Sequence, residues 1–216
     1  MQSQTSKLSN QEIGQRLQIY QLLSSYYLEG VHSLSIEQIE AIKGGVYGDR
    51  VPIRAACQLV ADGLLINNDL LLMETFDYNR LFVGPGKVLA SPYESAYRSA
   101  KRLLMQKQTL EVRSFYQRLG IENRQEGSLP DDHLGLELEF VSYLLYQMLY
   151  VQEQPELFYE YYCEFIEKHV LQWAISHCDR VIDHSKTSLC KGMGILLKGM
   201  LEYERQTIAK RQLQTI

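Results

Sequence analysis

Residues 134–148 read LGLELEFVSYLLYQM, and this stretch indicates the fold class most clearly. Its apolar side chains recur at intervals of four and three residues, at Leu134, Leu138, Val141, Leu145 and Met148. These intervals follow one face of an α-helix, and such a seam is typical of a helix that packs against a core. We therefore expect a long helix that starts at Pro130-Asp131-Asp132.

Helix signals also occur on both sides of this stretch. Ser9 and Glu12 have the spacing of a capping box, and Gly30 is suited to end the helix that follows. Ser35 and Gln38 open a second helix, which Gly44-Gly45 stops. Further helices are expected over about 53–66, 70–83, 155–184 and 188–212, with a break at residues 67–69. Residues 94–120 are expected to form one or two helices.

Strict alternation of apolar and polar residues, the mark of a half-buried strand, does not run long enough anywhere to predict a sheet. We predict an all-α protein, a single globular domain over residues 1–216 with roughly eight to twelve helices. Two irregular segments are expected, at 84–92, which holds two prolines and two glycines, and at the polar loop 121–130. This loop would join two helical halves, 1–120 and 131–216.

Composition excludes several classes of protein. The 216 residues contain 22 Lys and Arg against 26 Asp and Glu, a net charge of −4, which argues against a nucleic-acid-binding protein. No run approaches the roughly 18 apolar residues of a membrane span, so no stable membrane insertion is expected. Residues 1–16 lack the apolar core of a secretory signal, and we expect a cytoplasmic protein.

The negative charge is concentrated in one stretch. Residues 122–167 contain eleven carboxylates and one arginine, a net charge of −10. Solvated helix faces are the default interpretation. The alternative is an acidic surface for a basic partner segment.

The sequence predicts no catalytic residue, metal site or cofactor. The four cysteines are widely spaced, and the histidines form no ligand pair. Gly84-Pro85-Gly86-Lys87 lacks the spacing of a phosphate loop, and Gly192-Met193-Gly194 lacks that of a dinucleotide-binding loop. For Asp132-His133, an N-cap aspartate beside a hydrogen-bonded histidine is a better explanation than acid–base catalysis. The fifteen tyrosines fit either core edges or a recognition surface, and composition does not decide between them.

Three segments together carry a family resemblance. Residues 74–86 read ETFDYNRLFVGPG, residues 91–97 read SPYESAY, and residues 130–140 read PDDHLGLELEF. Two shorter matches accompany them, Val112-Arg113 with Phe115-Tyr116, and Phe165 with His169 and Trp173. The ordered set resembles the TorD/DmsD family of cytoplasmic redox-enzyme maturation chaperones.

The resemblance implies an all-helical chaperone without catalysis. Its partner would be the precursor of a molybdopterin-containing oxidoreductase, bound through its twin-arginine leader and held back from export until cofactor insertion is complete. Carried over by motif, the leader-binding residues are Tyr78, Leu81, Phe82, Pro85, Pro92, Tyr93, Ser95, Tyr97, Asp132 and His133.

These residues suggest how a leader is bound. A groove lined by Leu81, Phe82, Tyr93 and Tyr97 would take the apolar run, and Asp132 with neighbouring carboxylates would meet the arginine pair. Two alternatives stay open: a nucleotide-binding or nucleotide-hydrolysing enzyme, and a purely structural interaction module. A monomer and a dimer formed by helix exchange are both compatible with the loops.

Overall fold

The computed structural model describes residues 8–65, 68–100, 103–123, 129–151 and 153–214. Within these ranges the chain is helical, and an isolated antiparallel bridge between Tyr93 and His133 is its only β-type pairing. The α-helices are α1 (Asn10–Glu29), α2 (Ile36–Lys43), α3 (Val51–Leu64), α4 (Asn68–Phe82), α5 (Glu94–Arg98), α6 (Lys107–Gln117), α7 (Leu134–Tyr146), α8 (Pro155–Phe165), α9 (Leu171–His184) and α10 (Ser188–Gln214). A 3-10 turn, η1 (Val31–Ser33), and two π-helical segments, η2 (Gln147–Val151) and η3 (Ile166–Val170), complete the described elements. The all-α prediction is confirmed.

The predicted capping boxes start the first two helices. The Glu12 N–H donates to Ser9 Oγ at 3.2 Å, while the Ser9 N–H donates to Glu12 Oε2 at 2.9 Å. Ser35 and Gln38 make the same reciprocal pair at the start of α2. Each box satisfies two backbone N–H groups that a helix start leaves unpaired.

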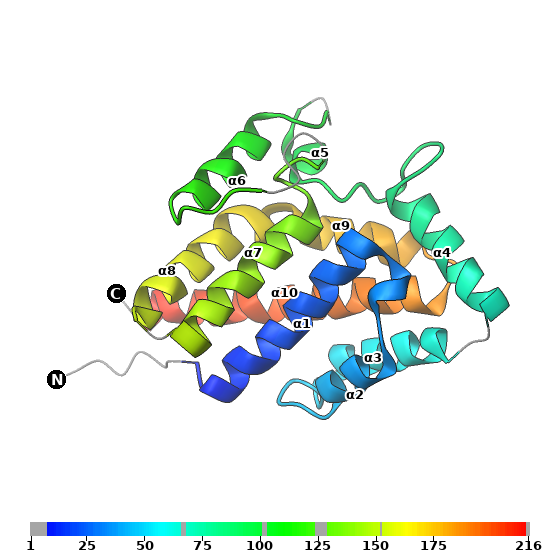
Figure 1. Ribbon diagram of the computed structural model, residues 1–216, viewed down its shortest axis with the longest axis horizontal. Helices are drawn as coiled ribbons and strands as arrows, with labels where there is room; N and C mark the ends of the chain where they lie inside the picture. Colours follow the sequence, from blue (N-terminus) through cyan, green and yellow to red (C-terminus); the bar gives the residue numbers. More distant parts are fainter. Residues whose placement is uncertain (1–7, 66–67, 101–102, 124–128, 152, 215–216) are drawn as a thin grey trace.

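A packed helix pair and a packed group of three helices organise the molecule (Figure 1). The helices α1 and α7 lie side by side and antiparallel, since Ser24 on α1 donates to the Gly135 carbonyl at the start of α7 while Gly14 lies near Leu149. The long helix α10 packs along α3 and α9. A Cβ at Gly192 would lie 2.7 Å from Val60 Cγ2, so the glycine allows α10 and α3 to approach closely.

The apolar seam of α7 is buried as expected. Leu134, Leu138, Val141 and Leu145 have no exposed surface, and Met148 is 7% exposed. A buried ion pair connects α1 to α10. The guanidinium of Arg16 on α1 lies 2.7 Å from the Glu204 carboxylate on α10, and both side chains are buried.

Some element boundaries differ from the prediction. Helix α7 begins at Leu134 rather than at Pro130. Residues 94–120 form two helices, α5 and α6, which is one of the two arrangements expected. The predicted helix 155–184 consists of α8, η3 and α9 in succession. The irregular segment 84–92 is confirmed, with positive φ at Gly84 and Gly86. Of the predicted polar loop, residues 124–128 lie outside the described residues, as does Asn67 of the predicted break before α4.

No helix in the described part of the chain is both long enough and apolar enough to cross a bilayer.

Candidate functional site

The structure brings the residues singled out in the sequence into two adjoining groups. One group lies on α4 and in the loop after it, and comprises Tyr78, Leu81, Phe82 and Pro85. The other joins the segment around α5 to the start of α7, and comprises Pro92, Tyr93, Ser95, Tyr97, Asp132 and His133.

The second group is held together by backbone hydrogen bonds. The Leu134 N–H donates to the Pro92 carbonyl at 2.8 Å, and the Glu94 N–H donates to the Asp132 carbonyl at 3.0 Å. Between them Tyr93 and His133 form the antiparallel bridge, with ring centroids 5.0 Å apart. We call this arrangement the α5–α7 junction.

Asp132 is a buried acceptor within this junction. Its Oδ2 accepts the Ser95 backbone N–H at 2.8 Å, and its Oδ1 accepts the Thr109 hydroxyl at 2.8 Å. The side chain has no exposed surface, so both carboxylate oxygens are used internally. As the structure stands, Asp132 is therefore not open to an arginine pair, and it is not the N-cap of α7.

The N-cap of α7 is His133. Its Nδ1 accepts the Gly135 N–H at 3.1 Å, in the manner of an Asn or Ser cap. Burial lowers the pKa of His133 to about 4, because the charged imidazolium is disfavoured away from water. The ring is therefore neutral at pH 7 and acts as a hydrogen-bond acceptor.

The α4 group is part of an aromatic cluster rather than a groove wall. Leu81 has no exposed surface and Phe82 is 6% exposed. Tyr78 is half-buried, and its hydroxyl donates to the Tyr27 carbonyl at 3.1 Å. The Tyr78 and Phe82 rings meet edge to face at 5.0 Å, and Phe82 stacks on His177 at 5.7 Å.

His177 connects the two groups, and the sequence interpretation did not include it among the site residues. Its Nε2 lies 2.9 Å from the Tyr27 hydroxyl, and its Nδ1 lies 3.2 Å from the Tyr97 hydroxyl. Burial lowers the pKa of His177 to about 3, so this ring is also neutral at pH 7. The sequence does carry one signal that could have identified His177: it follows Trp173 by four residues, which places both on one face of α9.

Two further buried carboxylates adjoin the α5–α7 junction. Glu94 pairs with Arg98 and with His169 Nδ1, the latter at 3.1 Å. Glu137 accepts the indole N–H of Trp173 at 3.2 Å. Burial, together with the charges of nearby carboxylates, raises the pKa of Glu137 well above its ordinary value.

Exposure separates the predicted residues. Pro85 is exposed, the tyrosines 78, 93 and 97 are half-buried, and the remaining six are buried, namely Leu81, Phe82, Pro92, Ser95, Asp132 and His133. In this conformation the ten residues do not line one open groove.

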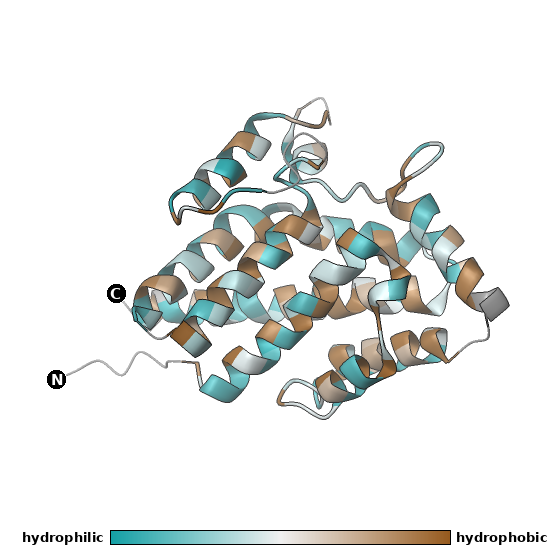
Figure 2. Ribbon diagram, viewed as in Figure 1, coloured by the Kyte–Doolittle hydropathy of each residue, from teal (hydrophilic) through white to brown (hydrophobic). Residues whose placement is uncertain are grey.

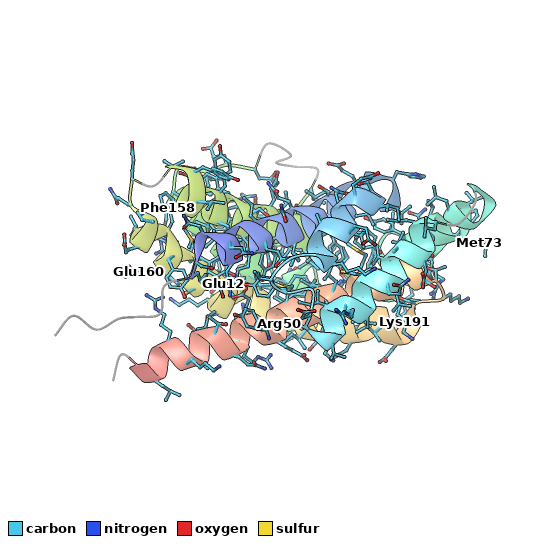
Figure 3. All side chains as sticks on the ribbon, turned by 90° about the horizontal axis from the view of Figure 1, so that it is seen from below. Glu12, Arg50, Met73, Phe158, Glu160 and Lys191 are labelled. Carbon is cyan, nitrogen blue, oxygen red and sulfur yellow. The ribbon has the colours of Figure 1, made fainter. Side chains whose placement is uncertain are left out.

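The exposed apolar residues lie on the other side of α4. Leu72, Met73, Phe76 and Val83, which follows the last residue of the helix, are between 53% and 64% exposed. We call these four residues the α4 face. Figure 2 shows hydrophobic residues alternating with hydrophilic ones along this helix, and Figure 3 labels Met73 at the end of the molecule. Phe76 and Val83 belong to the same motif as Tyr78 and Leu81.

Among the described residues, no group of three or more His, Cys, Asp or Glu side chains is arranged to hold a metal ion. All four cysteines are buried and unpaired with one another.

Comparison with known proteins gives the family. Residues 50–179 match the family model described as nitrate reductase delta subunit. Chaperone protein TorD of Aliivibrio salmonicida is 27% identical over 172 residues, which cover 74% of this chain and 79% of that protein. Chaperone protein TorD of Shewanella pealeana is 32% identical over 143 residues, covering 60% of this chain and 64% of that protein. The probable Tat proofreading chaperone DmsD of Haemophilus influenzae is 25% identical over 132 residues, covering 61% and 60%.

The chain belongs to the TorD/DmsD family of chaperones, which are not catalytic enzymes. The family resemblance and the chaperone role predicted from the sequence are confirmed.

Proposed function

We propose that this chaperone works in the cytoplasm as one domain over residues 1–216. There it binds the twin-arginine leader of a molybdopterin-containing oxidoreductase precursor and delays export until the cofactor is inserted. The name of the relative from Haemophilus influenzae, a probable Tat proofreading chaperone, supports this kind of client. A leader of this kind presents two arginines followed by an apolar run that tends to form a helix.

The α4 face carries the proposal. Its four large apolar side chains are more than half exposed, and Leu72, Phe76 and Val83 follow one side of the helix at intervals of four and seven residues. Contiguous exposed apolar surface marks interaction sites on soluble proteins. The apolar side of a leader helix packs against such a surface as in helix-in-groove recognition.

Hydrogen bonds from the inner side of α4 to the start of α10 explain why the α4 face is exposed to solvent. Asp77 Oδ2 accepts the backbone N–H groups of Lys186 and Thr187 at 2.7 and 3.0 Å, just before α10. Glu74 Oε1 accepts the Leu189 N–H at 3.2 Å. Both carboxylates thus satisfy N–H groups at the start of α10, where the helix dipole also favours negative charge. This fixes the rotation of α4.

The residues predicted from the family motif support this surface in our proposal. Pro85 is exposed two residues after Val83, and Tyr78 ties the inner side of α4 to the Tyr27 carbonyl. Tyr93 and Tyr97 are half-buried around α5. The buried members, with Asp132 and His133 at the α5–α7 junction, hold the segment 84–97 in position.

A calorimetric titration with a synthetic twin-arginine leader tests the proposal. The leader is expected to bind saturably, because its apolar run buries the α4 face. A matched peptide that keeps both arginines but has serine and glycine in place of the apolar run is expected to bind at least about tenfold more weakly. Equal binding of the two peptides, or no binding of the leader, would refute the proposal.

A further inference from the structure

A hollow lies between α1 and α7, at a different place from the α4 face. Its volume is about 400 Å³. Its lining includes Gln21 and Ser24 from α1 with Glu139, Ser142, Tyr143 and Tyr146 from α7. In Figure 1 these two helices lie together at the centre of the view, whereas α4 stands apart from them on the right.

Two of the three serines that line this hollow, Ser24 and Ser142, present acceptors, and the third, Ser25, can donate or accept. Ser24 Oγ donates its proton to the Gly135 carbonyl, and Ser142 Oγ donates its proton to the Leu138 carbonyl, each at 2.9 Å. Each hydroxyl oxygen therefore keeps only lone pairs for further hydrogen bonds. The exposed side chain of Glu139 adds two carboxyl oxygens to the lining. The hollow thus suits a ligand with several N–H donors.

The charge of the surrounding surface favours a cation. Over residues 10–29 and 134–151 the only cationic side chain is Arg16, which is buried against Glu204. The exposed charges of these segments are the carboxylates of Glu29 and Glu139, and Glu12 is half-buried.

Aromatic rings complete the lining. Tyr143 is half-buried, and Tyr146 is 47% exposed with its ring 4.9 Å from that of Tyr150. A guanidinium is planar, carries five N–H donors, binds carboxylates in a fork and stacks on aromatic faces, whereas a lysine ammonium is a compact point charge. We propose that the hollow is an arginine site, which binds a guanidinium of the leader's arginine pair through Glu139 and the two tyrosine rings.

This inference rests on the proposed function, and it separates the arginine contacts from the apolar contacts of the same leader. Asp132, the contact expected from the sequence, has both oxygens engaged inside the α5–α7 junction. Near the end of α4 the exposed Lys87 and Lys186 disfavour a pair of arginines.

The test is calorimetry with two leader peptides, one with the arginine pair and one with two lysines in its place. The protein variants are Glu139→Gln and the matched control Glu160→Gln, an exposed glutamate on α8 that Figure 3 labels at the end of the molecule opposite Met73. Wild type and Glu160→Gln are expected to bind the arginine peptide about tenfold more tightly than the lysine peptide. Glu139→Gln is expected to lose about tenfold for the arginine peptide and to bind both peptides alike.

A second variant adds charge instead of removing it. Gln21→Glu places another carboxylate in the hollow and is expected to tighten binding of the arginine peptide about threefold at low salt. Equal affinity of wild type, Glu139→Gln and Gln21→Glu for the arginine peptide would overturn the arginine site while leaving leader binding intact. Absence of any binding of this peptide to wild type would overturn the proposed function and the arginine site together.

Discussion

The carboxylate of Asp132 accepts the backbone N–H of Ser95 at 2.8 Å, and this hydrogen bond joins two family motifs that are 37 residues apart in the chain. The same carboxylate accepts the Thr109 hydroxyl, so a third segment, α6, is tied to the junction. The Asp-His pair of this chain therefore positions the segment that contains Tyr93 and Tyr97.

Replacing Asp132 is expected to destabilise the fold. Asp132→Ala leaves the buried Ser95 N–H and the Thr109 hydroxyl without their acceptor, and we expect the free energy of unfolding to fall by about 2–4 kcal/mol. Urea unfolding measures this loss. Asp183→Ala, at an exposed position of α9, is the control and is expected to change stability by less than about 0.5 kcal/mol. Equal stability of the two variants would contradict the buried role of Asp132.

His133 is expected to make the protein less stable in acid. Its pKa is lowered to about 4 by burial, whereas in the unfolded chain it is about 6.5. As the pH falls from 6.5 to 4, the unfolded state takes up a proton first, and up to about 3 kcal/mol of stability present above pH 6.5 is lost.

The control for this effect is His133→Asn, which keeps an N-cap acceptor but does not titrate in this range. Between pH 7 and pH 4.5 the variant should lose about 2 kcal/mol less stability in urea unfolding than wild type. Identical pH dependence of the two proteins would argue against a buried neutral histidine.

Glu137 is expected to have the opposite pH dependence. Burial raises its folded-state pKa, so the stability it contributes is present below its unfolded pKa near 4.3 and is lost as the pH rises towards the folded value. Glu137→Gln keeps an acceptor for the Trp173 indole and removes this titration. Relative to wild type, the variant should gain at least about 1 kcal/mol of stability between pH 5 and pH 8. A difference that does not vary with pH would show that Glu137 titrates normally.

The buried ion pair between Arg16 on α1 and Glu204 on α10 gives a fourth prediction. Arg16→Met leaves the Glu204 carboxylate buried without its partner, and we expect a loss of about 3–5 kcal/mol in unfolding free energy. Arg54→Met, which removes an exposed pair with Asp49, should cost less than about 1 kcal/mol. The double variant Arg16→Met/Glu204→Leu should be more stable than Arg16→Met alone. If it is not, the carboxylate is not the source of the loss.

Much of the fold could be predicted from local sequence. The capping boxes at Ser9 and Ser35 and the seam of residues 134–148 each act within one helix, so the residues themselves carry the signal. The start of α7 could not be predicted in the same way. An aspartate before a helix is usually its N-cap, but Asp132 binds Ser95, and this tertiary contact leaves the cap to His133.

The site was less predictable, because exposure depends on how the helices pack. The motif around Tyr78 identified α4, but it did not show which side of the helix faces inward. That orientation follows from Asp77 and Glu74, which bind the start of α10 more than a hundred residues later. As a result Leu81 and Phe82 lie in the core, while Phe76 and Val83 are exposed. The predicted leader contacts stay a prediction, as does the division into two helical halves.

The most direct measurement compares leader affinity across two variants of matched exposure. Phe76, on the α4 face, is 59% exposed, and Leu110, on α6 at the other end of the molecule in Figure 1, is 60% exposed. Aspartate at either position should leave the fold intact, which the urea midpoint verifies. In calorimetry with the synthetic leader, Phe76→Asp should weaken binding at least about tenfold and Leu110→Asp less than about twofold. Equal affinities of wild type and both variants would contradict leader binding at α4.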